Sequence, residues 1–196
     1  EENHQSEYAA GWLDTTASGA TFGRGAVHLA EHATGQTPLV WQPKKARNIP
    51  FFAPSGMMNA LSIRVHNALY FNKNRSGERI ADIDSYFYPL DALQNWNRLY
   101  GRRGFVQYQF CLPDESALKG IGQIMDTVRR SPDTPFLSVL KRHGERPPEA
   151  IHSFPIKGYS LALDFPRTRS IFALVKKLDA MVWDFGGKIY LTKDAC

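Results

Sequence analysis

Apolar and polar positions alternate most regularly between Gly104 and Leu112. A period of two, with aromatic residues at the apolar positions, predicts a β-strand. Gln107 and Gln109 are two residues apart and therefore point to the same face of the strand. Tyr108 and Phe110 share the opposite face, which we expect to form core beneath helices.

Two later segments carry apolar residues at helical spacing and predict amphipathic helices. The first follows Pro113 and runs to about Arg130, and the second runs from Ser170 to Trp183. A third helix is expected from Asn59 to Phe71. The apolar positions expected to share one side of the first helix are Leu118, Ile121, Ile124, Met125 and Val128, and those of the second are Ile171, Leu174, Val175, Leu178 and Val182.

Shorter β-patterns and breaks fill the rest of the chain. Strands are expected at Glu7–Asp14, Ala26–His32, Arg79–Tyr88, Phe136–Lys141, Tyr159–Phe165 and Lys188–Leu191, the first two forming an antiparallel pair. Asp91 is expected to cap a short helix from Ala92 to Leu99. Loops are expected at Thr34–Ser55 and Arg142–Ala150, where prolines interrupt any period.

The order of these elements from Gly104 onward predicts the fold class. Strand, helix, strand are followed by strand, helix, strand, which is the split β-α-β arrangement of a ferredoxin-like unit. We therefore expect an α+β fold whose antiparallel sheet has helices on one face. The other face, which carries Gln107 and Gln109, is left open for a partner or ligand.

Composition narrows the function classes only slightly. The 196 residues are 43% apolar and 22% charged, with a net charge of +5, which favours anionic partners. No apolar run reaches the roughly 18 residues of a membrane span, so any membrane contact would be peripheral. Two cysteines, Cys111 and Cys196, are too few for a disulfide framework and suit the cytoplasm.

Motif searching leaves several alternatives open. His28 and His32 are four residues apart, and this spacing alone is weak evidence for a metal site. No set of metal ligands is predicted. No nucleophile elbow is present. Tyr108 and Phe110 could stack bases as in single-strand RNA binders, although a core role is the simpler reading. A lysine at a strand end, such as Lys141 or Lys193, can hold an anion.

Longer motifs carry a family resemblance. They are Gly11-Trp12-Leu13-Asp14, Tyr86-Phe87-Tyr88-Pro89-Leu90-Asp91, Trp96-Asn97-Arg98, Gly104–Phe110, Ser153-Phe154-Pro155-Ile156, Leu163-Asp164-Phe165-Pro166 and Phe185–Tyr190 with Lys193-Asp194. In this order they resemble the FAD-linked oxidases of the vanillyl-alcohol-oxidase superfamily, in particular the decaprenylphosphoryl-ribose 2'-oxidase-like members. The likeness covers nearly the whole chain.

The resemblance implies a domain organisation. These enzymes have a flavin domain and an inserted substrate domain, and residues 1–196 correspond to the substrate domain alone. The cofactor would be FAD, bound mainly by a flavin domain that is absent from this chain. The chain alone is therefore expected to be inactive, and its partners would be that flavin domain and a small alcohol or sugar, not nucleic acid.

The resemblance also assigns roles to individual residues. Lys193 falls on the lysine that sits against the flavin, where a cation can stabilise the anionic reduced cofactor, so it is both the catalytic and the cofactor-binding candidate. The substrate-binding candidates are Trp12, Phe87, Gln107, Gln109, Lys141, Ser160 and Ala162. Phe87, Ser160 and Ala162 depart from the family's tyrosine, asparagine and, in mycobacterial enzymes, cysteine.

These departures limit the functional prediction. The resemblance implies hydride transfer from a CH–OH group to flavin, with a sugar, polyol or sugar-derived alcohol as substrate. The residues alone leave open a non-catalytic ligand-binding or RNA-binding α+β module.

Overall fold

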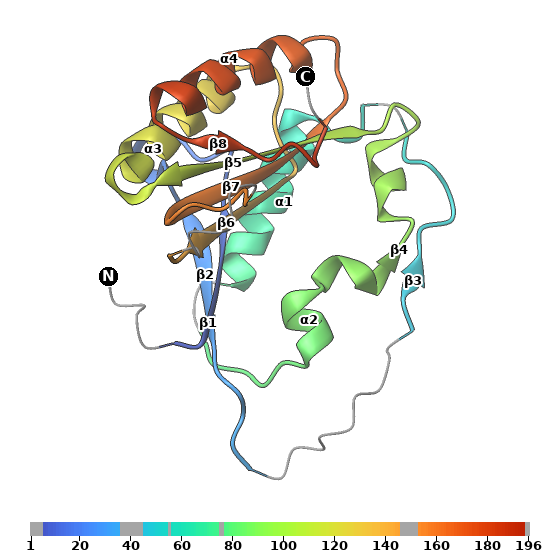
Figure 1. Ribbon diagram of the computed structural model, residues 1–196. Coiled ribbons are helices and arrows are strands. Elements are labelled where there is room, and N and C mark those ends of the chain that lie inside the picture. The colour runs from blue at the N-terminus through green and yellow to red at the C-terminus, as the bar shows by residue number, and fades with distance from the viewer. Residues whose placement is uncertain (1–5, 36–44, 55, 75–76, 146–152, 195–196) are drawn as a thin grey trace.

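A computed structural model of the chain describes residues 6–35, 45–54, 56–74, 77–145 and 153–194. At its centre lies a six-stranded antiparallel sheet in the order β2-β1-β6-β7-β5-β8 (Figure 1). The strands are β1 (Tyr8–Leu13), β2 (Gly25–Ala30), β5 (Phe105–Pro113), β6 (Leu137–His143), β7 (Gly158–Pro166) and β8 (Lys188–Ile189). Two further strands, β3 (Arg47–Asn48) and β4 (Leu93–Gln94), form a small parallel pair.

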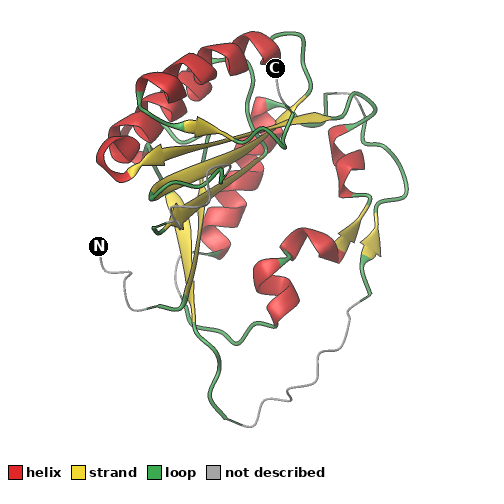
Figure 2. Ribbon diagram, viewed as in Figure 1, coloured by secondary structure: helices red, strands yellow, loops and turns green. Residues whose placement is uncertain are grey.

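The second half of the chain confirms the predicted α+β fold. Helix α3 (Asp114–Arg130) connects β5 to β6, and helix α4 (Ile171–Asp184) connects β7 to β8. The four strands lie in the order β6-β7-β5-β8, as a ferredoxin-like unit requires. The β1–β2 hairpin extends the sheet beyond β6, and both helices cover one face (Figure 2).

The core lies between this sheet face and the two helices. Tyr108 and Phe110 are 2% and 0% exposed, so the prediction that they are core beneath the helices is confirmed. One predicted helix position is wrong: Leu118 is 92% exposed. The buried residues of α3 include Ala117, Ile124 and Val128, and Leu118 faces solvent because it is one position removed from that row.

The Gly186-Gly187 break ends α4 as a Schellman motif. Gly186 has φ +68°, which favours glycine, and its N–H donates to Trp183 O at 2.9 Å. The Gly187 N–H donates to Val182 O at 2.8 Å. The chain therefore reverses at once into β8, whose Lys188 and Ile189 pair with β5.

Helix α1 (Ala60–Lys73) occupies the other side of the sheet, at the β1 end. Asn59 caps it by accepting hydrogen bonds from the N–H groups of Leu61 and Ser62. The ring centroids of Tyr70, on α1, and Trp12, on β1, are 4.7 Å apart. The face opposite α3 and α4 is thus covered at one end by a helix.

Two expected elements between residues 79 and 99 are wrong. The predicted strand Arg79–Tyr88 contains helix α2 (Ile83–Phe87), because Asp82 accepts hydrogen bonds from Ser85 N at 3.1 Å and Ser85 Oγ at 2.6 Å. The predicted helix Ala92–Leu99 is broken into two 3₁₀ turns and β4, because Asn95 adopts φ +58°.

Other expectations fall partly outside the described residues. Strand β6 continues to His143, so the predicted loop begins later than Arg142, and residues 146–150 lie outside the described part. The loop expected at Thr34–Ser55 includes the short strand β3, while residues 36–44 and 55 are not described. Cys196 also lies outside the described residues. Within the described residues, no helix is both long and apolar enough to cross a membrane.

Candidate functional site

The sheet face opposite α3 and α4 brings together most of the residues singled out in the sequence. We call it the polar face and define it by Trp12, Gln107, Gln109, Lys141, Ser160 and Ala162. Strand register places them together: Trp12 pairs with Val139, Val139 with Ala162, and Ala162 with Gln109. Lys141 pairs with Ser160 in the next row. Residues directly opposite in neighbouring strands share a face.

Trp12 is held at one end of the polar face by a polar network beneath α1. Asp14 accepts hydrogen bonds from Asn67 Nδ2 on α1 at 2.9 Å and from Thr16 Oγ1 at 2.6 Å, and it pairs with Arg24. Burial alone would raise the pKa of Asp14, but these hydrogen bonds lower it below its ordinary value. The carboxylate thus fixes α1 against β1, and Trp12 is only 8% exposed.

The two glutamines differ in accessibility. Gln109 is 9% exposed and its backbone oxygen accepts a hydrogen bond from Tyr190 N at 2.9 Å. Gln107 is half-buried, and its backbone N–H donates to Asp194 Oδ2 at 2.8 Å. The chain after β8 therefore follows the edge of β5 and brings Asp194 to Gln107.

Lys193 lies within this turn. Its N–H donates to Tyr190 O at 3.1 Å, and its side chain is half-buried. Its ammonium is close enough to Asp164, on β7, to lower the pKa of that carboxyl. Asp164 pairs with Gln107 in the sheet register, so Lys193, Gln107 and Asp164 form one cluster at this end of the polar face.

Ser160 lies at the other end and is fully buried. Its hydroxyl is 2.8 Å from His143 Nε2. Beside it Cys111 is also fully buried, and the Cys111 Sγ contacts Ile156 O at 3.6 Å. Burial raises the pKa of the Cys111 thiol, which keeps it protonated and unreactive.

His143 contacts Ser160 through this hydrogen bond, and Lys141 lies two residues before His143 on the same face of β6. Burial, followed by the positive charge of Lys141, lowers the pKa of His143. The imidazole is therefore neutral near pH 7 and can both donate and accept hydrogen bonds. Lys141 itself is exposed on the polar face.

Phe87 is the one candidate that comes from outside the sheet and the turn after β8. Phe87 is the last residue of helix α2 and is 45% exposed. Its ring packs edge-on against that of Tyr8 on β1, with 5.0 Å between the ring centroids. Tyr86 anchors the helix by donating to His28 O at 3.1 Å. Tyr8 is four residues from Trp12 and shares its face, so Phe87 borders the polar face without lying in it.

Sequence reasoning missed Asp164 and His143. Asp164 interrupts the apolar run Leu161–Phe165. This interruption was an available signal, because an aspartate is seldom found at a buried strand position unless its charge is paired. His143 carried no signal, because the strand was expected to end at Lys141. It continues for two more residues and brings His143 to Ser160.

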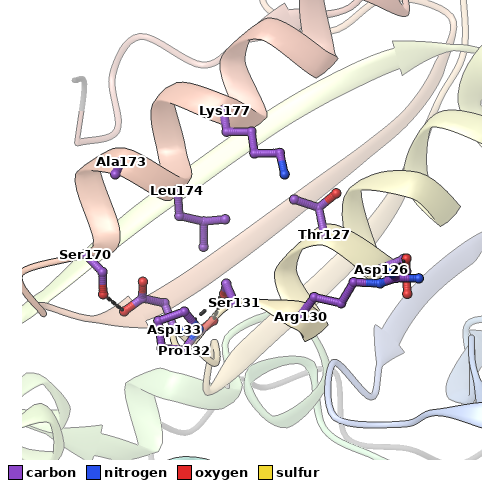
Figure 3. Close-up of a pocket in the computed structure, with 10 residues that line it drawn as sticks. All are labelled: Asp126, Thr127, Arg130, Ser131, Pro132, Asp133, Ser170, Ala173, Leu174 and Lys177. Atoms are coloured by element: carbon purple, nitrogen blue, oxygen red, sulfur yellow. Dashed lines mark hydrogen bonds and ion pairs between the residues drawn. The ribbon is translucent and has the colours of Figure 1, made fainter.

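A separate cleft lies on the helical side of the sheet. This cleft of about 540 Å³ is lined by the end of α3, the following loop and the start of α4 (Figure 3). Its buried Asp133 accepts hydrogen bonds from Ser170 Oγ at 3.0 Å and Thr168 Oγ1 at 2.5 Å. These contacts organise the start of α4, on the helical side of the sheet. No cluster of potential metal ligands occurs among the described residues.

The geometry defines an elongated polar sheet face, with a lysine and a carboxylate at one end and a histidine and a lysine at the other. Such a face suits a small hydroxylated molecule, because amides and imidazole can pair with hydroxyl groups.

Comparison with known proteins relates the chain to an oxidase. It is 30% identical, over 96% of its length, to the decaprenylphosphoryl-β-D-ribose oxidase of Mycolicibacterium smegmatis, strain ATCC 700084 / mc(2)155. It is 28% identical, again over 96% of its length, to an uncharacterised protein from the mprA 5' region of Streptomyces coelicolor. The chain spans 42% and 55% of these relatives. No family model matches it.

Proposed function

We propose that this chain is the substrate-binding part of an FAD-dependent oxidoreductase. The enzyme would oxidise a CH–OH group of a sugar, polyol or sugar-derived alcohol. The observation that carries the proposal is the convergence of Gln107, Gln109 and Lys193 with Trp12 on or beside one sheet face, in a chain similar to an oxidase.

The described residues fit one side of a flavin and not the whole of FAD. One common site for the cofactor's phosphates is a glycine-rich turn that opens a helix. The glycines at Gly23 and Gly25 instead lead into strand β2, so they supply no helix N-terminus. The polar face, by contrast, offers amide groups and a nearby ammonium on one side of the sheet. We infer that FAD is held mainly by residues beyond this chain.

Each group on the face has a separate task in the proposed reaction. Oxidation of an alcohol transfers a hydride from carbon to bound flavin and releases the hydroxyl proton to water. Gln107 and Gln109 orient substrate hydroxyls. Lys193 provides positive charge beside the flavin, where negative charge develops as the flavin is reduced. Trp12, together with α1, closes one end of the substrate site.

A non-catalytic role is the alternative from another class. Base stacking by RNA would need exposed aromatic rings, and Tyr108 and Phe110 are buried under the helices. Simple binding of a hydroxylated ligand would use the same polar face without chemistry.

Purification of the complete polypeptide separates these readings. The proposal expects stoichiometric FAD whose absorbance near 450 nm is bleached anaerobically by at least one member of a panel of sugars and polyols. A complete polypeptide without flavin, or with a flavin that no alcohol reduces, would reject the proposed activity.

A further inference from the structure

Asp164 is an unusual occupant of its position. It lies in β7 between two partners in the sheet, Gln107 of β5 and Leu137 of β6, and its backbone oxygen accepts a hydrogen bond from Phe136 N at 2.9 Å. The residue is only 3% exposed. Buried strand positions of this kind are usually apolar, because a carboxylate loses its hydration there.

The carboxyl group is incompletely compensated. Among the described residues, Asp164 Oδ2 has no hydrogen-bond partner. Burial raises the pKa of Asp164 to about 6, while a hydrogen bond from Gln107 and the charge of Lys193 act in the opposite direction. Asp194 raises this pKa further. The other titratable neighbour is Tyr100, whose own pKa is raised by burial and then by Asp164.

A carboxylate kept in such a place destabilises the folded chain at neutral pH. Asparagine would fill the same volume without the cost of burying charge. Destabilising polar groups concentrate at functional sites, and this one lies beside the lysine on which the proposed function depends.

We propose that Asp164 is the positioning residue of Lys193, its negative charge attracting the Lys193 ammonium toward the edge of the polar face. This inference rests on the proposed function for what the ammonium then does. Asp164 is too buried to touch a substrate, so it acts through Lys193. Gln107 joins the two strands at this point and completes the cluster.

The link between the two residues is testable without catalysis. In the complete polypeptide labelled with ¹³C in its aspartate carboxyl groups, the Asp164 resonance is assigned by its loss in Asp164→Asn. Lys193→Met should raise the pKa of Asp164, because the carboxylate loses a favourable charge. Lys141→Met is the matched control, since Lys141 lies in another row of the same face, and it should leave this pKa unchanged. An unchanged pKa in Lys193→Met overturns the proposal.

Kinetics then tests the positioning role. Asp164→Asn should slow flavin reduction at pH 7.5 by about tenfold or more, with KM altered by less than about threefold, because orientation and not affinity is lost. The wild-type rate should fall as the pH drops through about 6, where Asp164 becomes protonated, and the variant should lack this limb. Asp164→Glu should recover part of the rate.

The outcomes distinguish the two proposals. If Lys193→Met shifts the Asp164 pKa but no alcohol reduces the flavin, the electrostatic link between Lys193 and Asp164 stands and the proposed function fails. If the wild-type enzyme turns over and Asp164→Asn has an unchanged rate and pH profile, the positioning role is rejected while the proposed function stands.

Discussion

His143 and Ser160 show how a single hydrogen bond can select a protonation state. The 2.8 Å contact between His143 Nε2 and Ser160 Oγ fixes one nitrogen of the ring, and burial and Lys141 disfavour its charged form. At neutral pH the pair is therefore uncharged. The polar face thus combines a neutral imidazole at one end with the charged Lys193 at the other.

The protonation state of His143 can be measured directly. We predict that its imidazole titrates below the ordinary value of about 6.5. Lys141→Met should raise the pKa of His143, because a repelling positive charge is removed. Titration of the ring ¹H–¹⁵N correlations by NMR checks both statements. A wild-type His143 pKa of 7 or above would contradict this description.

At the scale of elements, helix α3 depends on a glycine where it crosses the sheet. A Cβ on Gly120 would overlap Leu112 Cδ1 and lie 3.0 Å from Phe185 Cγ. Leu112 is fully buried and cannot move aside easily. Gly122, two residues later, has open space around the equivalent position. The close approach of α3 to β5 and to the end of α4 therefore explains why residue 120 is a glycine, but it does not explain Gly122.

This difference gives a matched pair of variants. Gly120→Ala should lower the free energy of unfolding by about 1–3 kcal/mol, because overpacking outweighs the gain in helix propensity. Gly122→Ala should raise it by about 0.5–1 kcal/mol through propensity alone. Urea denaturation followed by circular dichroism measures both. Equal effects of the two substitutions would show that α3 does not pack this closely.

The same elements show what the sequence could and could not predict. Strand β5 and helices α3 and α4 were predictable because their apolar periods match the faces that they bury. Helix α2 was not, because Asp82 and Ser85 form a local cap that outweighs the aromatic, strand-like composition. Helix α1 was predicted, but its position against Trp12 depends on Asp14 and Asn67, which are 53 residues apart.

The candidate site was predictable to a similar extent. The spacing of Gln107 and Gln109 predicted their common face, and the family resemblance supplied the remaining candidates. Asp164 carried a signal, as a carboxylate within an apolar strand, but its neighbours Gln107 and Lys193 are brought to it only by the fold. His143 carried none, because its contact with Ser160 arises only from strand pairing.

At the scale of the whole molecule, the chain has its own core on one side of the sheet and the polar face on the other. Sixteen buried residues form the cluster between the sheet and helices α3 and α4, which is enough to organise the ferredoxin-like unit. The polar face has α1 packed against its β1 end and exposes Lys141, whereas Gln109 and Ser160 are buried and Lys193 is half-buried. In the proposed enzyme, the flavin would lie against this face.

This arrangement predicts the behaviour of the 196-residue chain alone. It should purify without flavin absorbance and without oxidase activity, because most contacts to FAD would be missing. Absorbance spectra and a flavin assay after denaturation provide the measurement. Yellow protein with stoichiometric FAD would show that the chain binds the cofactor by itself. It would contradict the proposal that FAD is bound mainly by residues beyond this chain.

The most direct test of the central claim is the rate of flavin reduction in Lys193→Ala, measured anaerobically by stopped flow in the complete polypeptide. Removal of a charge that stabilises the transition state typically costs about 100-fold or more, and a loss of that size is predicted here. Lys141→Ala, on the same face but in a different row, should alter KM more than the rate. A near-normal rate in Lys193→Ala would remove this lysine from the mechanism and contradict the account.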